Sequence, residues 1–241
     1  MAKLLFPLAI GLLVLVVVIA LLLGGPQSRI DPAVLALFWH PPLVPAARAL
    51  THLGDVTTVA AAAVAAAGWL LLRGHRRRAI LLLVIVVSER LLVEAMKNVF
   101  DRARPDPLGH EVAVHNLAFP SGHSANAMAG WLAIALLATS PRLRRPAIVL
   151  ALAIALITGL CRLVLQVHWP SDVAGGWAFG AAWTLLLVHL FGTASPAVPA
   201  SPSSAPEHQC QVVRRHLHDP LEPEPVLPRL GLDRLQVPKP P

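Results

Sequence analysis

The chain has 241 residues, of which 56% are hydrophobic and only 14% are charged, and its mean hydropathy is +0.64. A soluble domain carries about 25% charged residues, so this composition argues against an ordinary soluble enzyme and favours a membrane protein. The net charge of +7 would suggest nucleic-acid binding in a soluble protein. Here the basic residues stand in short blocks between apolar runs, as is typical of membrane topology, and we predict no nucleic-acid partner.

Six apolar segments come close to the ~20 residues that a membrane helix needs. The first follows Lys3 and is too long for a signal-peptide core. A proline-rich connection follows it, with a helix start at Asp31-Pro32. Asp55 is placed to cap the second segment. We therefore predict an all-α, polytopic membrane protein with a six-helix bundle in residues 1–192, whose spans are residues 4–24, 56–72, 79–99, 121–139, 146–165 and 170–191.

The remaining residues, 193–241, are rich in proline, serine, glutamate and histidine. This composition cannot bury a core, and it predicts a disordered cytoplasmic tail. Cys161 lies in an apolar run and Cys210 in this tail, so the sequence predicts neither a disulfide framework nor a zinc site.

The third predicted span carries charges that are costly in lipid and are therefore expected to face the bundle interior. Arg90, Glu94 and Lys97 share one helix face. We expect Arg90 and Glu94 to give structural support, and Lys97 alone to reach the chemistry.

The basic blocks set the predicted orientation. Lys3, residues 73–78 and residues 142–145 hold most of the Lys and Arg that flank the spans, and placing them in the cytoplasm puts both termini there. The opposite ends of the spans then share the outer face, and these ends carry Lys97, Arg104, Ser121, His123, Arg162, His168 and Asp172.

Three polar clusters occupy this face, namely Lys97 to Pro105 (Lys-x6-Arg-Pro), Pro120 to His123 (Pro-Ser-Gly-His) and Arg162 to Asp172 (Arg-x5-His-x3-Asp). Pro120 is expected in the first turn of a helix. The backbone N–H groups of Ser121 and Gly122 are then expected to be free. Such a helix start binds phosphate-like anions.

Three cations add to this anion site: Lys97, Arg104 and Arg162. Arginine binds phosphate through paired hydrogen bonds, and lysine acts as a point charge. Together they suit a dianion whose charge spreads over its equatorial oxygens during transfer. Nonspecific binding of lipid headgroups is the alternative, but it leaves the nearby histidines and aspartate unexplained.

These remaining residues predict a catalytic group. His168 can attack phosphorus through a neutral ring nitrogen. Asp172, in the first turn of the sixth span, can accept the other ring N–H and fix the tautomer. His123 is the predicted general acid for the leaving oxygen.

We predict no catalytic metal and no cofactor. Asp101 and Asp106 are too few for a metal site and lie among arginines. His110 and His115 are five residues apart, unlike the two histidines of a His-Glu-x-x-His zinc motif.

The three clusters resemble the signature of the type 2 phosphatidic acid phosphatases, the PAP2 family, which is Lys-x6-Arg-Pro, Pro-Ser-Gly-His and Ser-Arg-x5-His-x3-Asp. The resemblance covers residues 1–192, and Cys161 stands where the family usually has Ser. It implies a six-helix membrane fold, a phosphohistidine intermediate on His168 and metal independence. It also implies a phosphate site made of Lys97, Arg104, Ser121, Gly122, His123 and Arg162.

Several functions remain open at this point. The same motifs resemble those of vanadium-dependent haloperoxidases, but the apolar spans weigh against those largely soluble enzymes. A lipid phosphotransferase, or a membrane protein that binds lipid phosphate without turnover, would use the same residues. Phosphatidate, phosphatidylglycerophosphate, undecaprenyl pyrophosphate and lipid A phosphate all fit as substrates. We expect a lipid phosphatase of a bacterial inner membrane with its site on the outer face; the oligomeric state is open.

Overall fold

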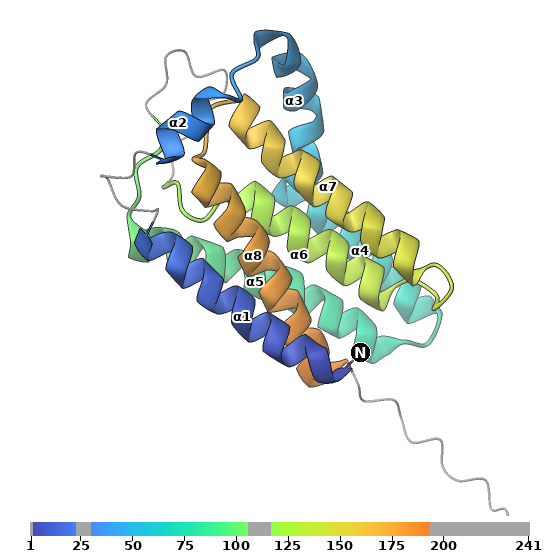
Figure 1. Cartoon of the computed structure of the whole chain (residues 1–241). Helices are drawn as coiled ribbons and strands as arrows, with labels where there is room; N and C mark the ends of the chain where they lie inside the picture. Colours follow the sequence, from blue (N-terminus) through green and yellow to red (C-terminus); the bar gives the residue numbers. More distant parts are fainter. Residues whose placement is uncertain (1, 23–29, 106–116, 193–241) are drawn as a thin grey trace, which may run out of the picture. The chain divides into compact units, whose positions relative to one another are not determined.

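The structure is a computed structural model that describes residues 2–22, 30–105 and 117–192, and every regular element in these ranges is a helix (Figure 1). The prediction of an all-α fold is confirmed for this part of the chain. The predicted tail, residues 193–241, and the segment with His110 and His115 lie outside the described residues.

The long helices follow the predicted segments to within a few residues. A short α-helix and two short 3₁₀ helices, which the sequence did not predict, connect α2 to α4. The elements are α1 (Ala2–Leu22), α2 (Ile30–Ala36), η1 (Pro41–Leu43), α3 (Val44–Thr51), η2 (His52–Gly54), α4 (Val56–Leu72), α5 (Arg76–Phe100), α6 (Gly122–Leu137), α7 (Arg144–Val164) and α8 (Pro170–Phe191).

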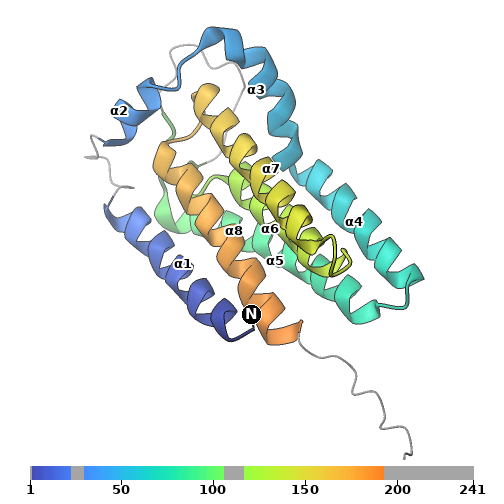
Figure 2. The same cartoon turned by 45° about the vertical axis from the view of Figure 1, so that its right-hand side comes forward.

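Helix α6 lies at the centre of the bundle and packs against α4, α5, α7 and α8 (Figures 1 and 2). Helix α1 runs along α8 at the edge (Figure 2). Small residues let α6 and α8 approach closely: a Cβ at Gly176 would lie 2.6 Å from the carbonyl oxygen of Ser121. This contact fixes the start of α6 against the first turns of α8.

Within the described ranges, three helices are long and apolar enough to cross a membrane: α1 over Leu4–Leu22, α7 and α8. The pair Ile30–Ala36 and Pro41–Gly54, bent by 76°, counts as a fourth if it is one span. Helices α4 and α6 have 17 and 16 residues, fewer than the ~20 of a typical span, and α5 carries several charges along its 25 residues. The six-span arrangement therefore stays a prediction.

The start of α6 differs from its prediction. The helix begins at Gly122 with Ser121 as N-cap, so Pro120 precedes the cap and is not in the first turn. The Phe119–Pro120 peptide bond is cis. The N–H of Ser121 is not free, because it donates to the carbonyl of Asp172 at 2.9 Å. The start of α6 packs against the first turns of α8, and this tertiary contact takes the place of the expected free donor.

Candidate active site

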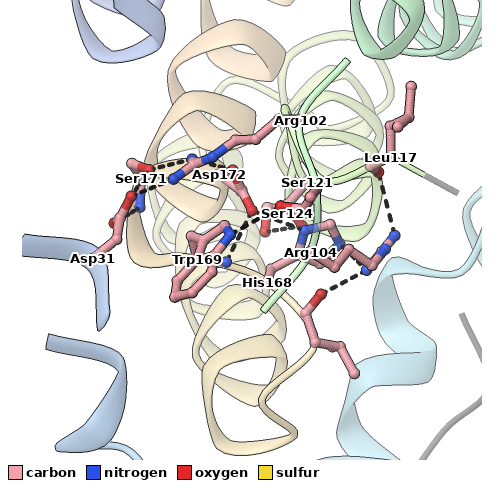
Figure 3. A network of polar contacts seen from close by, with 12 residues as sticks. Asp31, Arg102, Arg104, Leu117, Ser121, Ser124, His168, Trp169, Ser171 and Asp172 are labelled. Carbon is pink, nitrogen blue, oxygen red and sulfur yellow. Dashed lines mark hydrogen bonds and ion pairs between the residues drawn. The ribbon is translucent and has the colours of Figure 1, made fainter. Parts of the chain in front are cut away.

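The predicted site residues gather at one end of the bundle, where α5 and α7 end and α6 and α8 begin (Figure 1). Figure 3 shows Arg104, Ser121, His168 and Asp172 there. Five of them are at most 4% exposed although they are polar or charged. Since burying such groups is costly unless they are paired or functional, this end of the bundle is the strongest candidate site among the described residues. The five are Lys97, Ser121, Arg162, His168 and Asp172.

The imidazole of His168 is held from both sides. Its Nε2 lies 3.0 Å from Arg104 Nη1, and its Nδ1 lies 3.4 Å from Asp172 Oδ2. A guanidinium can only donate, so Nε2 is the accepting nitrogen and the ring hydrogen is on Nδ1, toward Asp172. The 3.4 Å separation is longer than the ~2.9 Å of a usual N–H···O bond.

The surroundings of His168 keep its ring neutral. Burial lowers its pKa well below the usual value of 6.5, and the positive charges of Arg104 and Arg162 lower it further. Burial also lowers the pKa of Arg104, while the charge of Asp172 opposes that shift. The site thus places an unprotonated ring nitrogen among cations, which is the state that a nucleophile requires.

The two carboxylate oxygens of Asp172 contact different partners. Its Oδ2 accepts the backbone N–H of Trp169 at 2.8 Å as well as facing His168. Its Oδ1 accepts Arg102 Nη1 at 2.5 Å. Asp172 lies in the first turn of α8, as predicted, and every contact of its carboxylate fixes the orientation that Oδ2 presents to His168.

Arg102 connects this carboxylate to α2 (Figure 3). Its Nη2 donates to Asp31 Oδ2 at 2.6 Å, and its Nη1 also contacts Ser171 Oγ at 2.6 Å. The N–H of Ser171 donates to Asp31 Oδ1 at 3.0 Å. Helix α2, which the sequence treated only as a connecting element, therefore contributes a buried carboxylate to the support of the site.

Arg162 provides a candidate contact for an anion. Its Nη1 donates to Thr51 Oγ1 at 3.2 Å, but its buried Nε has no hydrogen-bond partner among the described residues. A buried donor without a partner costs about 1–3 kcal/mol. A phosphate oxygen in the site would remove this cost.

Lys97 reaches the start of α6. A Cβ at Gly122 would lie 3.6 Å from its Nζ and 3.4 Å from Arg90 Nη1. Glu94 Oε1 accepts from Lys97 at 3.0 Å and from Arg90 at 2.7 Å. The three residues form a row of ion pairs along the helix face that they share, and this row ends beside the Pro-Ser-Gly-His segment.

His123 also has a carboxylate partner. Its Nε2 lies 2.6 Å from Asp55 Oδ1, and His52 Nδ1 lies 2.6 Å from the other oxygen of Asp55. The side chains of His123 and Asp55 are 29% and 28% exposed. The site therefore contains two histidine–aspartate pairs, one buried and one at its rim.

Sequence reasoning missed three of these residues. Arg102 stands two positions before Arg104 in a segment without helical or strand periodicity, so nothing separated their roles. Asp31 and Asp55 were interpreted as helix starts. An aspartate at a helix start can also hydrogen-bond to a histidine, and this was the signal that Asp55 offered in the sequence. Which histidine it contacts depends on the packing of distant segments.

In the described part of the chain, no group of three or more His, Cys, Asp or Glu residues could hold a metal ion. Three aspartates near the site each pair with an arginine or a histidine: Asp31, Asp55 and Asp172.

Comparison with known proteins finds a family model, curated relatives and a solved structure that are similar to this chain. The family model described as the PAP2 superfamily matches residues 78–196. Lipid A 1-phosphatase of Rhizobium johnstonii is 35% identical over 126 residues, which are 48% of this chain and 49% of that protein. Phosphatidylglycerophosphatase B of Bacillus subtilis is 38% identical over 100 residues, 39% of this chain and 48% of that protein. The matches thus span about half the length of these curated relatives.

A more distant curated relative is an undecaprenyl-diphosphatase of Sulfolobus acidocaldarius, which is 34% identical over 76 residues, 32% of this chain and 34% of that protein. Among solved structures, the transmembrane PAP2-type phosphatidylglycerolphosphate phosphatase of Bacillus subtilis superimposes with a TM-score of 0.72 at 26% identity. This match covers 78% of this chain and 98% of that one. The helical arrangement around the site is therefore shared with a solved transmembrane phosphatase.

Proposed function

The chain belongs to the PAP2 superfamily, and from this premise we propose that it is an integral-membrane lipid phosphatase acting through a phosphohistidine on His168. Its substrate is a phosphomonoester or pyrophosphate of a membrane lipid. The observation that carries the proposal is the accepting Nε2 of a buried, neutral His168, flanked by Arg104 and near the unpartnered Nε of Arg162. The relatives support the substrate class, since their names are those of lipid phosphatases and a diphosphatase.

In the first step, Nε2 of His168 attacks phosphorus and forms an N–P bond while the bond from phosphorus to the leaving oxygen breaks. His123 gives its proton to that oxygen. The charge of the transferring group is neutralised by Lys97, Arg104 and Arg162. Asp172 stabilises the positive charge that develops on the phosphorylated imidazole by accepting its Nδ1–H.

In the second step, water attacks phosphorus and gives a proton to His123. The N–P bond breaks, phosphate leaves and His168 returns to its neutral form. The cycle consumes one water and restores the proton that His123 donated. Ser121 and Gly122 are proposed to hold the phosphate at the start of α6 together with the three cations.

For the membrane arrangement, we propose six spans in a bacterial inner membrane, with both termini in the cytoplasm and the site on the outer face. The first turn of α1 and the last turn of α8 lie at the same end of the bundle, opposite the site (Figure 1), which supports this orientation. Reporters fused after Phe191 test it. A reporter that is active only outside the cell would overturn it.

The test of the function is phosphate release by purified protein in detergent. Phosphatidate, phosphatidylglycerophosphate, undecaprenyl pyrophosphate and lipid A 1-phosphate form the panel. We expect release from at least one lipid, inhibition by vanadate as an analogue of the transition state, and full activity in EDTA. Transfer only in the presence of an alcohol acceptor would indicate a phosphotransferase. Binding without release would indicate a non-catalytic protein.

A further inference from the structure

Resting on the proposed function, we infer that Asp55 is the positioning residue of the general acid: its carboxylate holds the Nε2–H of His123, so that Nδ1 is the nitrogen that exchanges a proton with substrate and water. The contact is 2.6 Å long. This is short for a hydrogen bond of nitrogen to oxygen and fits a charge-assisted one. Asp55 is not in any of the three motifs.

The carboxylate is available for this contact because it does not serve its own helix. Asp55 is the N-cap residue of α4 but makes no side-chain capping hydrogen bond. Capping by Asp is worth about 0.5–2 kcal/mol. Asp55 forgoes this stabilisation, and its two oxygens contact His123 and His52 instead. Such a departure from local preference is expected at functional positions.

The backbone before Asp55 is fixed against α6. A Cβ at Gly54 would lie 2.6 Å from the carbonyl oxygen of His123, so only glycine allows this approach. Trp131 Nε1 donates to the carbonyl of Leu53 at 2.9 Å, and Asn126 Nδ2 donates to the carbonyl of Gly54 at 3.4 Å. These contacts hold the carboxylate of Asp55 in place beside the imidazole.

The charge state of Asp55 suits the role. Burial would raise its pKa, but the hydrogen bond from His52 and the charge of His123 outweigh burial and lower the pKa below 3.8. Asp55 is therefore ionised near neutral pH and accepts a hydrogen from His123 rather than donating one. Burial and the cations Arg162 and Arg104 disfavour the imidazolium form of His123, and the charge and hydrogen bond of Asp55 favour it.

This arrangement predicts a signature that depends on the leaving group. A lipid alkoxide needs a proton to depart, whereas nitrophenolate does not, and general acid catalysis is typically worth 10²–10⁴-fold. In Asp55→Asn the shape is kept, but the anion that fixes the tautomer and stabilises the imidazolium is lost. We expect a loss of ~10²-fold on the lipid and less than about threefold on nitrophenyl phosphate.

The matched control is Asp101→Asn. Asp101 is exposed, ends α5 in the left-handed region with φ of 44°, and asparagine tolerates that region. We expect this variant to hydrolyse both substrates at the wild-type rate. The double variant Asp55→Asn/His123→Ala should be no slower on the lipid than His123→Ala alone, because Asp55 acts only through that imidazole.

A second measurement does not depend on turnover. Nitrogen NMR of histidine-labelled protein in detergent, assigned with His123→Ala, should show the Nε2–H tautomer of His123 at alkaline pH, and a mixture of tautomers in Asp55→Asn. Equal losses on the two substrates, additive losses in the double variant, or an unchanged tautomer would each overturn the inference. If the wild type released no phosphate from any substrate, the proposed function would fail, and the tautomer would still decide the role of Asp55.

Discussion

The two histidine–aspartate pairs use the same residue types in different surroundings. The side chains of His168 and Asp172 are 2% and 0% exposed. The Asp172 carboxylate also accepts hydrogen bonds from Arg102 and from the Trp169 N–H. The pair of His123 and Asp55 lies at the rim and is about a quarter exposed. The difference suggests that the inner pair is built to keep one tautomer, while the outer pair is placed where a leaving group and water can reach it.

The largest expected effect comes from breaking the inner pair at its histidine. His168→Ala removes the attacking nitrogen, so turnover of both a lipid phosphate and nitrophenyl phosphate should fall by about 10⁶-fold, as for the loss of a catalytic nucleophile. Acid-labile phosphate trapped on the protein should disappear. Trapped phosphate that persists in this variant would reverse the roles of the two histidines.

Removing the acid of the outer pair should have an effect that depends on the substrate. His123→Ala is expected to slow lipid hydrolysis by about 10²–10⁴-fold and nitrophenyl phosphate hydrolysis far less. The phosphoenzyme should still form from the aryl substrate. Rates on both substrates measure this, and equal losses would reduce His123 to a phosphate-binding residue.

The support of the inner pair can be removed separately. Arg102→Met leaves Asp172 buried without its cation, and breaking one side of a buried ion pair costs about 3–5 kcal/mol of stability. Because His168 is then poorly oriented, both substrates should lose about 10²-fold in rate, unlike the selective loss in Asp55→Asn. Thermal unfolding and the two rates test this. Arg102→Lys keeps the charge without the forked geometry and should recover part of the stability. A wild-type rate in Arg102→Met would show that Arg102 does not orient the pair.

The pH dependence sharpens the same comparison. Since the pKa of His168 lies well below 6.5, its neutral form should persist as pH falls from 7.5 to 5.5, where a free histidine would lose about tenfold of its neutral form. The rate of phosphoenzyme formation from nitrophenyl phosphate, corrected for substrate ionisation, should change less than that. A tenfold fall would show an ordinary pKa.

Burial of a neutral His168 also makes the stability of the folded protein depend on pH. Below about pH 6.5 the unfolded chain binds a proton at this ring and the folded chain does not, so the free energy of unfolding decreases as the pH falls. Above that pH the ring is neutral in both states, and this loss of stability is absent.

The smallest effect is expected at Cys161. Its side chain packs in an apolar cluster with Val44, Ala47, Leu165 and Val167. Cys161→Ser restores the residue usual in the family, and the rate should fall by less than about tenfold, or ~1.4 kcal/mol of transition-state stabilisation. A larger fall in kcat/KM would give Cys161 a role in the site.

The helical class, the limits of most long helices and the three clusters could all be predicted from the amino-acid pattern. These are local properties, since apolar runs specify helices in lipid and a proline or aspartate at a fixed position specifies a helix start, as Pro170 and Asp172 do in α8. It also placed the clusters at the same end of the bundle, because the basic blocks order the helix ends alternately.

The partner of each polar group, by contrast, depends on how distant segments pack. Arg102 and Arg104 are two residues apart, yet one holds Asp31 and Asp172 and the other faces His168. Asp55 turns from its helix to His123, and the N–H of Ser121 goes to the carbonyl of Asp172. A buried polar group takes whichever partner packing brings within about 3 Å, and contacts between segments so far apart in the chain leave no local trace in the sequence.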